Sequence, residues 1–441
     1  MSDILSAAVD LLGPEGAVPW DALPPGQQAP IQGASSGALP QAVAYPNTQE
    51  QLAALMACAH RHHWRVLPCG SGSKLAWGGL AEGLDLVVST RRLNRLIDHA
   101  AGDLTVTAEA GLRLAELETT LATSSQLLGL DSAYGEQATL GGIVATGDVG
   151  SRRQRYGGVR DRLIGVSFVR YDGQIAKAGG RVVKNVAGYD LMKLLIGSYG
   201  TLGIVSQVTF RTYPAQESSQ SVVFAGPSAA VNQLSQALRA SPLTPTALDL
   251  LSPALMAALG QPREFGLAAQ VQSIAAGVEE QVQRLQLLGQ EAGLKAVVLR
   301  DEADAQFWQQ SSYRLFGSPS DGPDSTAVLA KVGILPAAAV SLLEQLEASG
   351  SLGRLNASGS VGHLRLEGGP NANETASIVM KLRSHCQSAG GYLTLLAAPS
   401  ELKQAVEVWG YSGNALAVMR QLKAQFDPPR LLSPGRFVGG I

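Results

Sequence analysis

The sequence contains few cysteines and few histidines. Its 441 residues include three cysteines, Cys58, Cys69 and Cys386, and six histidines. No two of the cysteines stand at the spacing of a metal-ligating pair. This excludes an iron–sulfur cluster or a cysteine-based zinc site within the chain, so electrons from any redox cofactor bound here need an external acceptor.

A charge excess of either sign is also missing. Lys and Arg number 34 against 36 Asp and Glu, for a net charge of −2, so nucleic acid is not an expected partner. The most apolar stretches are broken by Asp249 in one case and by Lys331 and Pro336 in another, so none can cross a bilayer. The first ten residues carry two acids and no basic segment, which argues against a secretory signal. The expected localisation is cytoplasmic.

Glycine, in contrast, is abundant and clustered. Three glycine-rich clusters cover residues 68–79, 139–157 and 197–203, each beside a segment that reads as a strand. Glycine permits positive φ and lets backbone N–H groups approach a ligand that a Cβ would hold away. The simplest common ligand for three such clusters is a dinucleotide.

The first cluster, Gly70-Ser-Gly-Ser-Lys74, fits neither of two familiar phosphate loops. A Rossmann fingerprint needs a small residue where Leu75 stands, and a Walker A loop needs Gly-Lys-Ser/Thr. What remains is a run of consecutive N–H groups with two hydroxyls and one ammonium nearby, which suits a pyrophosphate. An ordinary flexible turn is the alternative.

The pattern before residue 215 predicts an α+β nucleotide domain. A capping box at Thr48 precedes a helix over 48–62, and short strands are predicted at 64–67, 84–89, 103–110 and 203–212, with a hairpin over 166–177 and a helix over 112–123. Alternation predicts that the 103–110 strand is half buried. Residues 1–40 are expected to pack loosely or to lie across a partner.

From about residue 220 the order βαββαβ appears twice. Strands are predicted at 221–226, 247–252, 267–273 and 295–300 with helices at 227–240 and 277–292, and then at 327–333, 354–358, 362–367 and 391–397 with helices at 337–349 and 376–389. Two ferredoxin-like units that join into one large antiparallel sheet are expected. The predicted domains are 1–40, 41–215, 216–400 and 401–441, the last with a helix at 415–426.

Several runs resemble a known family. They are residues 103–111, 155–161, 183–193 and 197–203, together with Val408-Trp-Gly410 and the ending 432–441. They look like the FAD-binding domain of the vanillyl-alcohol oxidase and p-cresol methylhydroxylase (PCMH/VAO-type) flavoproteins, and most closely like E subunits of glycolate oxidase, also called glycolate dehydrogenase. The resemblance is strong over 40–215 and rests only on element order over 220–400.

This resemblance implies a non-covalently bound FAD and a set of residues that hold it. Cys69, Gly70, Ser71, Gly72, Ser73 and Lys74 would hold the pyrophosphate; Thr139, Gly141, Gly142, Ala145, Thr146 and Gly150 would line the flavin and ribityl; Gly203, Ile204 and Val205 would meet the adenosine; and Gly78, Tyr156 and Gly157 complete the set.

The sequence departs from the family at several positions. Thr146 and Ser433 stand where relatives usually have Asn, and Tyr199 where catalytic subunits have Glu. The paired cap histidines that hold a metal in those relatives are missing, since His363 and His385 are isolated. No metal site is therefore predicted.

No residue is an evident catalytic base. Four side chains could bind a carboxylate or, in the favoured interpretation, phosphate or reduced-flavin charge: Arg155, Tyr156, Arg160 and Lys184. His363 is a less favoured candidate for the base.

The predicted function is the FAD-binding subunit of a heteromeric glycolate dehydrogenase that oxidises glycolate to glyoxylate. Its expected partners are a catalytic FAD-binding subunit and an iron–sulfur subunit, and any membrane contact would be peripheral, through that complex. Two alternatives stay open: a flavin-bearing scaffold without turnover, and a free-standing enzyme acting on another 2-hydroxy acid.

Overall fold

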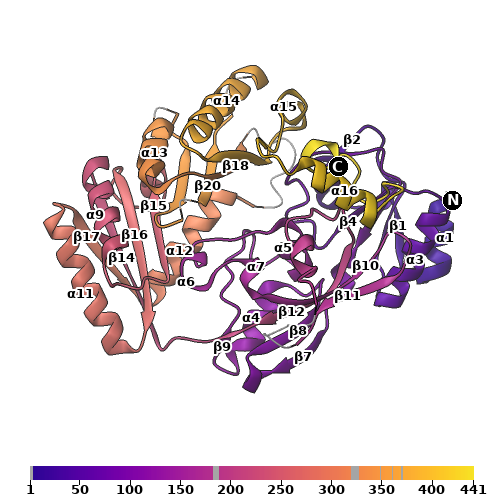
Figure 1. Ribbon diagram of the computed structural model, residues 1–441, viewed down its shortest axis with the longest axis horizontal. Helices are drawn as coiled ribbons and strands as arrows, with labels where there is room; N and C mark the ends of the chain where they lie inside the picture. The colour runs from indigo at the N-terminus through magenta and orange to yellow at the C-terminus, as the bar shows by residue number, and fades with distance from the viewer. Residues whose placement is uncertain (1–2, 182–187, 319–326, 348, 360, 369–370) are drawn as a thin grey trace.

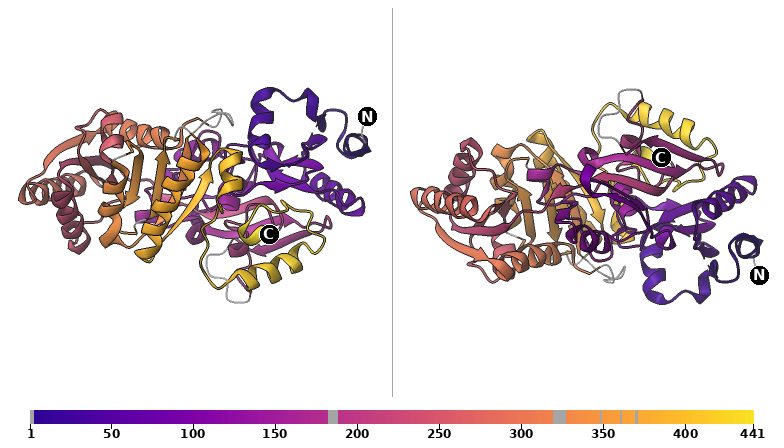
Figure 2. Two further views of the ribbon diagram at one scale, coloured as in Figure 1. Left: turned by 90° about the horizontal axis from the view of Figure 1, so that it is seen from above. Right: turned by 90° about the horizontal axis from the view of Figure 1, so that it is seen from below.

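The computed structural model describes residues 3–181, 188–318, 327–347, 349–359, 361–368 and 371–441. The first half of the chain forms two small sheets with their helices, and the second half forms one large sheet covered by helices (Figure 1). The C-terminal tail crosses back onto the first half, where it lies beside strands of that half in all views (Figures 1 and 2).

The N-terminal residues belong to the first sheet. This four-stranded sheet has the order β1-β3-β6-β4 and consists of β1 (Ala17–Pro19), β3 (Ala42–Ala44), β6 (Leu86–Ser89) and β4 (Val66–Cys69). Helix α3 (Gln49–Arg61) begins where Thr48 Oγ1 accepts from Gln51 N at 3.1 Å, as the capping box predicts.

Residues 3–40 do not pack loosely, so the expectation of loose packing is wrong. Helix α1 (Asp3–Leu12) buries Ile4, Ala8 and Leu12 in the core shared with α3, and β1 pairs with β3. A second helix follows in α2 (Pro25–Gln32). The apolar pattern of α1 is short, so the sequence contains little sign that this helix is packed. Three apolar residues on one face of the helix are nevertheless enough to fill this small core.

The second sheet is antiparallel and has the order β11-β10-β12-β8-β7. Its strands are β7 (Leu96–Ala100), β8 (Thr105–Glu109), β10 (Leu163–Val169), β11 (Ile175–Gly179) and β12 (Ile204–Arg211), and α4 (Leu114–Ala122) and α5 (Leu140–Thr146) pack on it. The predicted hairpin at Asp172-Gly173 is confirmed as β10–β11.

Strand β8 is buried on both faces, although its alternation predicts half-burial. Its polar residues are buried because they have partners: Thr107 Oγ1 lies 2.9 Å from Thr209 Oγ1, and Glu109 pairs with Arg95 at 2.7 Å. Hydrogen bonding lowers the cost of burying such groups, which sequence alternation alone does not reveal.

The cap sheet confirms the two βαββαβ units. The first unit contains β14 (Ser218–Gly226), α9 (Ser228–Ala240), β15 (Ala247–Leu251), β16 (Phe265–Ser273), α11 (Ala275–Glu291) and β17 (Lys295–Arg300); the second contains β18 (Val328–Gly333), α13 (Ala339–Glu347), β19 (Leu352–Asn356), β20 (Val361–Leu366), α14 (Ala372–Ser388) and β21 (Tyr392–Ala397). The order β17-β14-β16-β15-β19-β20-β18-β21 joins the units through the β15–β19 pair. Sequence reasoning missed α12 (Asp301–Phe316), which connects them.

The tail ties the two halves together. Helix α16 (Leu416–Phe426) follows α15 (Ser400–Ala405) and leads into residues 427–441. There Val66 N donates to Leu431 O at 2.7 Å, and Ser433 N donates to Val66 O at 2.9 Å.

The remaining short elements are β2 (Ser35–Ser36), β5 (Ala81–Glu82), β9 (Gln126–Leu127), β13 (Tyr213–Pro214), α6 (Arg153–Tyr156), α7 (Val159–Arg162), α8 (Met192–Leu195), α10 (Pro253–Ala258) and the 3-10 turns at 20–22, 90–92, 101–103, 336–338 and 438–440. Within the described part of the chain, no helix is both long and apolar enough to cross a membrane.

Candidate cofactor site

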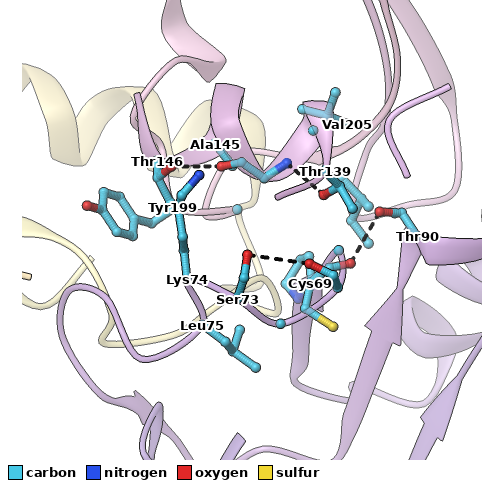
Figure 3. Close-up of a pocket in the computed structure, with 18 of the residues that line it drawn as sticks. Cys69, Ser73, Lys74, Leu75, Thr90, Thr139, Ala145, Thr146, Tyr199 and Val205 are labelled. Atoms are coloured by element: carbon cyan, nitrogen blue, oxygen red, sulfur yellow. Dashed lines mark hydrogen bonds between the residues drawn. The ribbon is translucent and has the colours of Figure 1, made fainter. Parts of the chain in front are cut away.

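A cavity lies where the three glycine clusters meet (Figure 3). The residues that line it are Pro68, Cys69, Gly70, Ser71, Gly72, Ser73, Lys74, Leu75, Thr90, Thr139, Gly141, Gly142, Ala145, Thr146, Tyr199, Gly200, Gly203, Ile204, Val205 and Arg436.

The loop after β4 is held by two carbonyl groups at its start and by the hydroxyl of Ser71. Ser89 Oγ donates to Gly70 O at 2.8 Å, Thr90 Oγ1 donates to Cys69 O at 3.2 Å, and Ser71 Oγ donates to Gln137 O at 2.6 Å. The backbone N–H groups of residues 71–74 have no hydrogen-bond partner among the described residues. The loop is therefore fixed with consecutive donors left for a ligand, which is the arrangement of an anion-binding nest.

Two glycines of this loop are required by its geometry. A Cβ at Gly70 would collide with Thr139 Oγ1, so the first and second clusters touch only because Gly70 has no side chain. Gly72 has φ +90°, in the region that L-residues avoid.

The opposite wall comes from α5 and the third cluster. Thr139 caps α5 by accepting from Gly142 N at 3.3 Å, and a Cβ on Gly141 would overlap Ala110 of the sheet, so α5 lies close to β8. Tyr199 N donates to Ala145 O at 2.8 Å, which connects the second and third clusters. The walls of small residues leave room for a flat ring system.

Arg436 reaches the cavity from the C-terminal tail. Its Nη2 donates to the carbonyls of Leu75 and Trp77, whereas the buried Nη1 has no partner among the described residues. Burial lowers the pKa of Arg436 to about 10, so the guanidinium still carries its charge at neutral pH. An unsatisfied cationic donor here calls for an acceptor on a ligand.

Lys74 forms a buried ion pair. Its Nζ lies 3.0 Å from Asp148 Oδ2 and 2.5 Å from Ser132 Oγ, and both charged side chains are almost fully buried. Burial lowers the pKa of Lys74, while Asp148 opposes that shift. The ammonium is thus already neutralised by a carboxylate, and the loop's N–H groups are the free donors for a phosphate.

Cys69 lies in the cavity wall as a neutral thiol. Burial raises its pKa to about 11, against the smaller effect of the hydrogen bond with Ser89. Since the thiolate is the reactive form, this thiol is a poor nucleophile at neutral pH. Non-covalent binding of the cofactor stays a prediction.

Most of the predicted cofactor residues gather in this one cavity, and their individual roles stay predictions. They are Cys69, Gly70, Ser71, Gly72, Ser73, Lys74, Thr139, Gly141, Gly142, Ala145, Thr146, Gly203, Ile204 and Val205. The anion-binding nest, the unpaired Arg436 Nη1 and the small-residue wall fit FAD, which offers phosphate oxygens and a planar ring.

Four predicted residues lie outside the cavity lining. Gly78 packs against Trp409 and Tyr199, and Gly150 packs against Asp131. Gly157 packs against Asp161, and the ring of Tyr156 lies 5.2 Å from that of Tyr213. In the structure these four residues pack against neighbouring side chains near the site and do not line the cavity.

Six lining residues were missed: Pro68, Leu75, Thr90, Tyr199, Gly200 and Arg436. Tyr199 and Gly200 fall inside the third glycine cluster, so the motif itself could have included them. Arg436 is separated from the loop it contacts by more than 350 residues, and only the conspicuous ending of the chain could have signalled it.

The candidate carboxylate-binding residues that the structure describes do not converge. Arg155 and Arg160 are exposed, Tyr156 is buried beside Tyr213, and Lys184 lies outside the described residues. His363 lies on β20 of the cap, outside the cofactor cavity. Within the described ranges, no group of three His, Cys, Asp or Glu side chains could hold a metal ion.

Comparison with known proteins agrees with this geometry. Residues 40–179 match the family model described as FAD binding domain. The chain is 38% identical over 154 residues to glycolate oxidase subunit GlcE of Escherichia coli K12, which is 35% of this chain and 43% of that protein. It is 34% identical over 189 residues to D-2-hydroxyglutarate dehydrogenase of Xanthomonas citri pv. viticola, 43% of this chain and 40% of that protein. These matches therefore span less than half the length of either relative.

Solved structures share the fold over nearly the whole chain. 4-Ethylphenol oxidase from Gulosibacter chungangensis superposes with a TM-score of 0.74 at 14% identity, covering 98% of this chain and 96% of the other. p-Cresol methylhydroxylase superposes with a TM-score of 0.72 at 15% identity and the same coverage. The PCMH/VAO-type α+β fold predicted from the sequence is thereby confirmed, cap included.

Proposed function

We propose that this chain is an FAD-dependent oxidoreductase acting on the CH–OH group of a 2-hydroxy acid, because residues 40–179 match the family model described as FAD binding domain. The observation that carries the proposal is the cavity lined by residues 71–74, by small residues of α5 and by Arg436. The N–H groups of residues 71–74 and Nη1 of Arg436 have no partner in the described part of the chain. The names of the relatives support the hydroxy-acid class.

In this proposal the chain's own residues bind and orient the cofactor. The N–H groups of residues 71–74 hold the phosphates, α5 and residues 199–205 supply the flat wall, and Arg436 supplies a positive charge. When bound, FAD would supply the redox chemistry, as the acceptor of the hydride equivalent that is lost when the CH–OH group becomes a carbonyl.

We further propose that the chain works as the FAD-binding subunit of a heteromeric glycolate dehydrogenase, with a catalytic flavoprotein subunit and an iron–sulfur subunit. The similarity to glycolate oxidase subunit GlcE supports this role. The three dispersed cysteines of this chain leave electron transfer beyond the flavin to another protein.

The test is anaerobic mixing of the purified chain with glycolate and, separately, D-lactate, followed by flavin absorbance. The subunit role predicts bleaching only when the partner subunits are added. Bleaching by the chain alone supports the free-standing enzyme instead. Bound FAD that stays oxidised in the complete complex with glycolate contradicts both and favours the scaffold.

A further inference from the structure

Two buried cationic side chains converge on residues 75–77, which directly follow the loop of the cofactor cavity. Lys403 Nζ, from α15, donates to Ala76 O at 2.5 Å and to Gly33 O at 3.5 Å. Arg436 Nη2, from the tail, donates to the carbonyl groups of the residues on either side of Ala76. Three consecutive carbonyl groups of the first half therefore bind side chains that come from two later parts of the chain.

These two side chains have no counter-ion in the part of the chain that the structure describes. Lys403 is 7% exposed and Arg436 is 3% exposed, and neither takes part in an ion pair there. The carbonyl groups accept their hydrogen bonds but carry no net charge. A cation withdrawn from water is stabilised by a nearby anion, so negative charge placed close to this pair would stabilise both.

The elements packed around Lys403 supply no such anion. Among the described residues, Arg436 is the charged group that acts on Lys403, and it disfavours protonation. Helix α2 and residues 33–36 contain no charged side chain. Lys74, three residues before Trp77, is already paired with Asp148. The carboxylates on α15, on the segment that follows it and beside the tail are exposed to solvent: Glu401, Glu407 and Glu82.

Arg436 places this pair next to the cofactor cavity. Arg436 and Leu75 line the cavity, and the buried Nη1 of Arg436 has no partner among the described residues. Lys403 does not line the cavity, since it binds the carbonyl group of the following residue, Ala76. Lys403 therefore responds to a ligand through charge and not through contact, and such an interaction is strong where water is excluded.

Lys403 is also able to exchange a proton near neutral pH. Burial, and to a smaller extent Arg436, lowers the pKa of its ammonium group to about 7. A buried lysine is a titrating group and not a permanent cation, unlike an arginine. Negative charge that appears in the cavity favours the charged form of Lys403 and raises its pKa again.

We propose that Lys403 takes up a proton from solvent when FAD bound in the cofactor cavity is reduced, and releases it when the FAD is reoxidised. A hydride equivalent from a CH–OH group brings two electrons and one proton and adds one negative charge to the cavity. The hydroxyl hydrogen leaves as a proton, and the Lys403 amine takes one proton to become an ammonium, so charge and protons balance. This inference rests on the FAD binding of the proposed function but not on the identity of the substrate.

The experiment measures the midpoint potential of the flavin in the full FAD-loaded chain as a function of pH, by reduction with dithionite in the presence of reference dyes. No 2-hydroxy acid is needed. Each proton taken up with two electrons lowers the potential by about 30 mV per pH unit. Between pH 7.5 and 9, the potential of the wild type should fall more steeply than that of Lys403→Met, by up to about 30 mV per pH unit.

Lys403→Arg separates proton uptake from a merely structural role. The guanidinium can donate to the same carbonyl groups but does not titrate in this range. It should lose the additional slope, as Lys403→Met does, and should show a higher potential than Lys403→Met at every pH because its charge is permanent. Lys295→Met, at an exposed lysine on the edge strand β17, is the matched control and should keep the slope of the wild type.

FAD content and unfolding temperature are measured for each variant. Equal slopes in the wild type and Lys403→Arg overturn the proposal, and so does a wild type that retains no FAD. A wild type with the additional slope, lost in both Lys403 variants, supports it. If the flavin of that wild type is never reduced by any 2-hydroxy acid, with or without partner subunits, the proton uptake stands and the proposed function is refuted instead.

Discussion

Gly70 is the residue at which the loop and α5 depend on each other most directly. A Cβ at this position would collide with Thr139 Oγ1, which also caps α5. We expect Gly70→Ala to push the loop away from the cavity and to weaken FAD binding about tenfold or more. Fluorescence titration of the apoprotein with FAD measures this effect.

The matched control is Gly102→Ala, because Gly102 has no neighbour within 4 Å of a built Cβ and no positive φ. It should bind FAD like the wild type. Equal affinities of Gly70→Ala and Gly102→Ala would refute the role assigned to the contact between Gly70 and Thr139.

Asp131 predicts a pH dependence of stability. Burial raises the pKa of this carboxyl to about 6 from the 3.8 of an unfolded chain, although Arg152 opposes the shift. A raised folded pKa gives stability that is fully present below the unfolded pKa and is lost as pH rises through 6. Over that window the wild type should lose about 3 kcal/mol from this group.

Asp131→Asn keeps an acceptor for Arg152 N, which Asp131 Oδ2 binds at 3.0 Å, and removes the titration. The free energy of unfolding is measured with denaturant at pH 4 and pH 8. As pH rises, the stability of the variant relative to the wild type should increase by about 3 kcal/mol. Asp21→Asn, at an exposed aspartate, should follow the wild type. Parallel pH profiles for Asp131→Asn and the wild type would contradict the prediction.

At the scale of elements, helix α16 fastens the tail to the cofactor cavity. Lys423 Nζ lies 2.6 Å from Asp427 Oδ2 and donates to Thr201 O and Leu432 O, each at 2.8 Å. Thr201 lies between Gly200 and Gly203 of the cavity wall, so one buried ammonium connects that wall to the returning tail.

Lys423→Met should therefore lower the free energy of unfolding by about 3–5 kcal/mol, because it leaves the buried Asp427 without its cation. It should also weaken FAD binding. Lys381→Met, on the exposed side of α14, is the control and should change neither quantity. If Lys423→Met kept both the stability and the FAD affinity of the wild type, the contacts of Lys423 with Asp427, Thr201 and Leu432 would contribute nothing to either.

Sequence reasoning placed the cap elements within a few residues because each has a clear local apolar pattern. The strands at 247–251 and 295–300 are short apolar runs, and the helix over 228–240 has apolar residues at a spacing of about 3.6. Helix α12 was missed because its apolar positions are sparse and its first turn is acidic. Its place is set by tertiary contacts, such as Asp304 with Ser219 and Ser221.

The site could likewise be predicted only where the signal lies within a short stretch of sequence. The loop 69–74 and the start of α5 could be recognised because glycine clusters carry a local signal. The ion pair of Lys74 with Asp148 and the approach of Arg436 could not, since both join segments far apart in sequence. Periodicity and motif spacing contain no information about such pairs.

At the scale of the whole molecule, the cofactor cavity is built from both ends of the chain. The first half supplies the loop and α5, the tail supplies Arg436, and an aromatic contact of Trp77, Tyr134 and Phe316 joins the FAD-binding domain to the cap. Because a ligand that binds only the folded state stabilises it, FAD should raise the stability of both halves together.

Main-chain donors of the first half, closed by the tail, are proposed to hold FAD. The decisive measurement is the flavin content of the purified chain, determined by absorbance before and after incubation with excess FAD and removal of the unbound cofactor. We expect yellow protein with one FAD per chain, released by denaturation because it is not covalently attached. Colourless protein that retains no added FAD would contradict it.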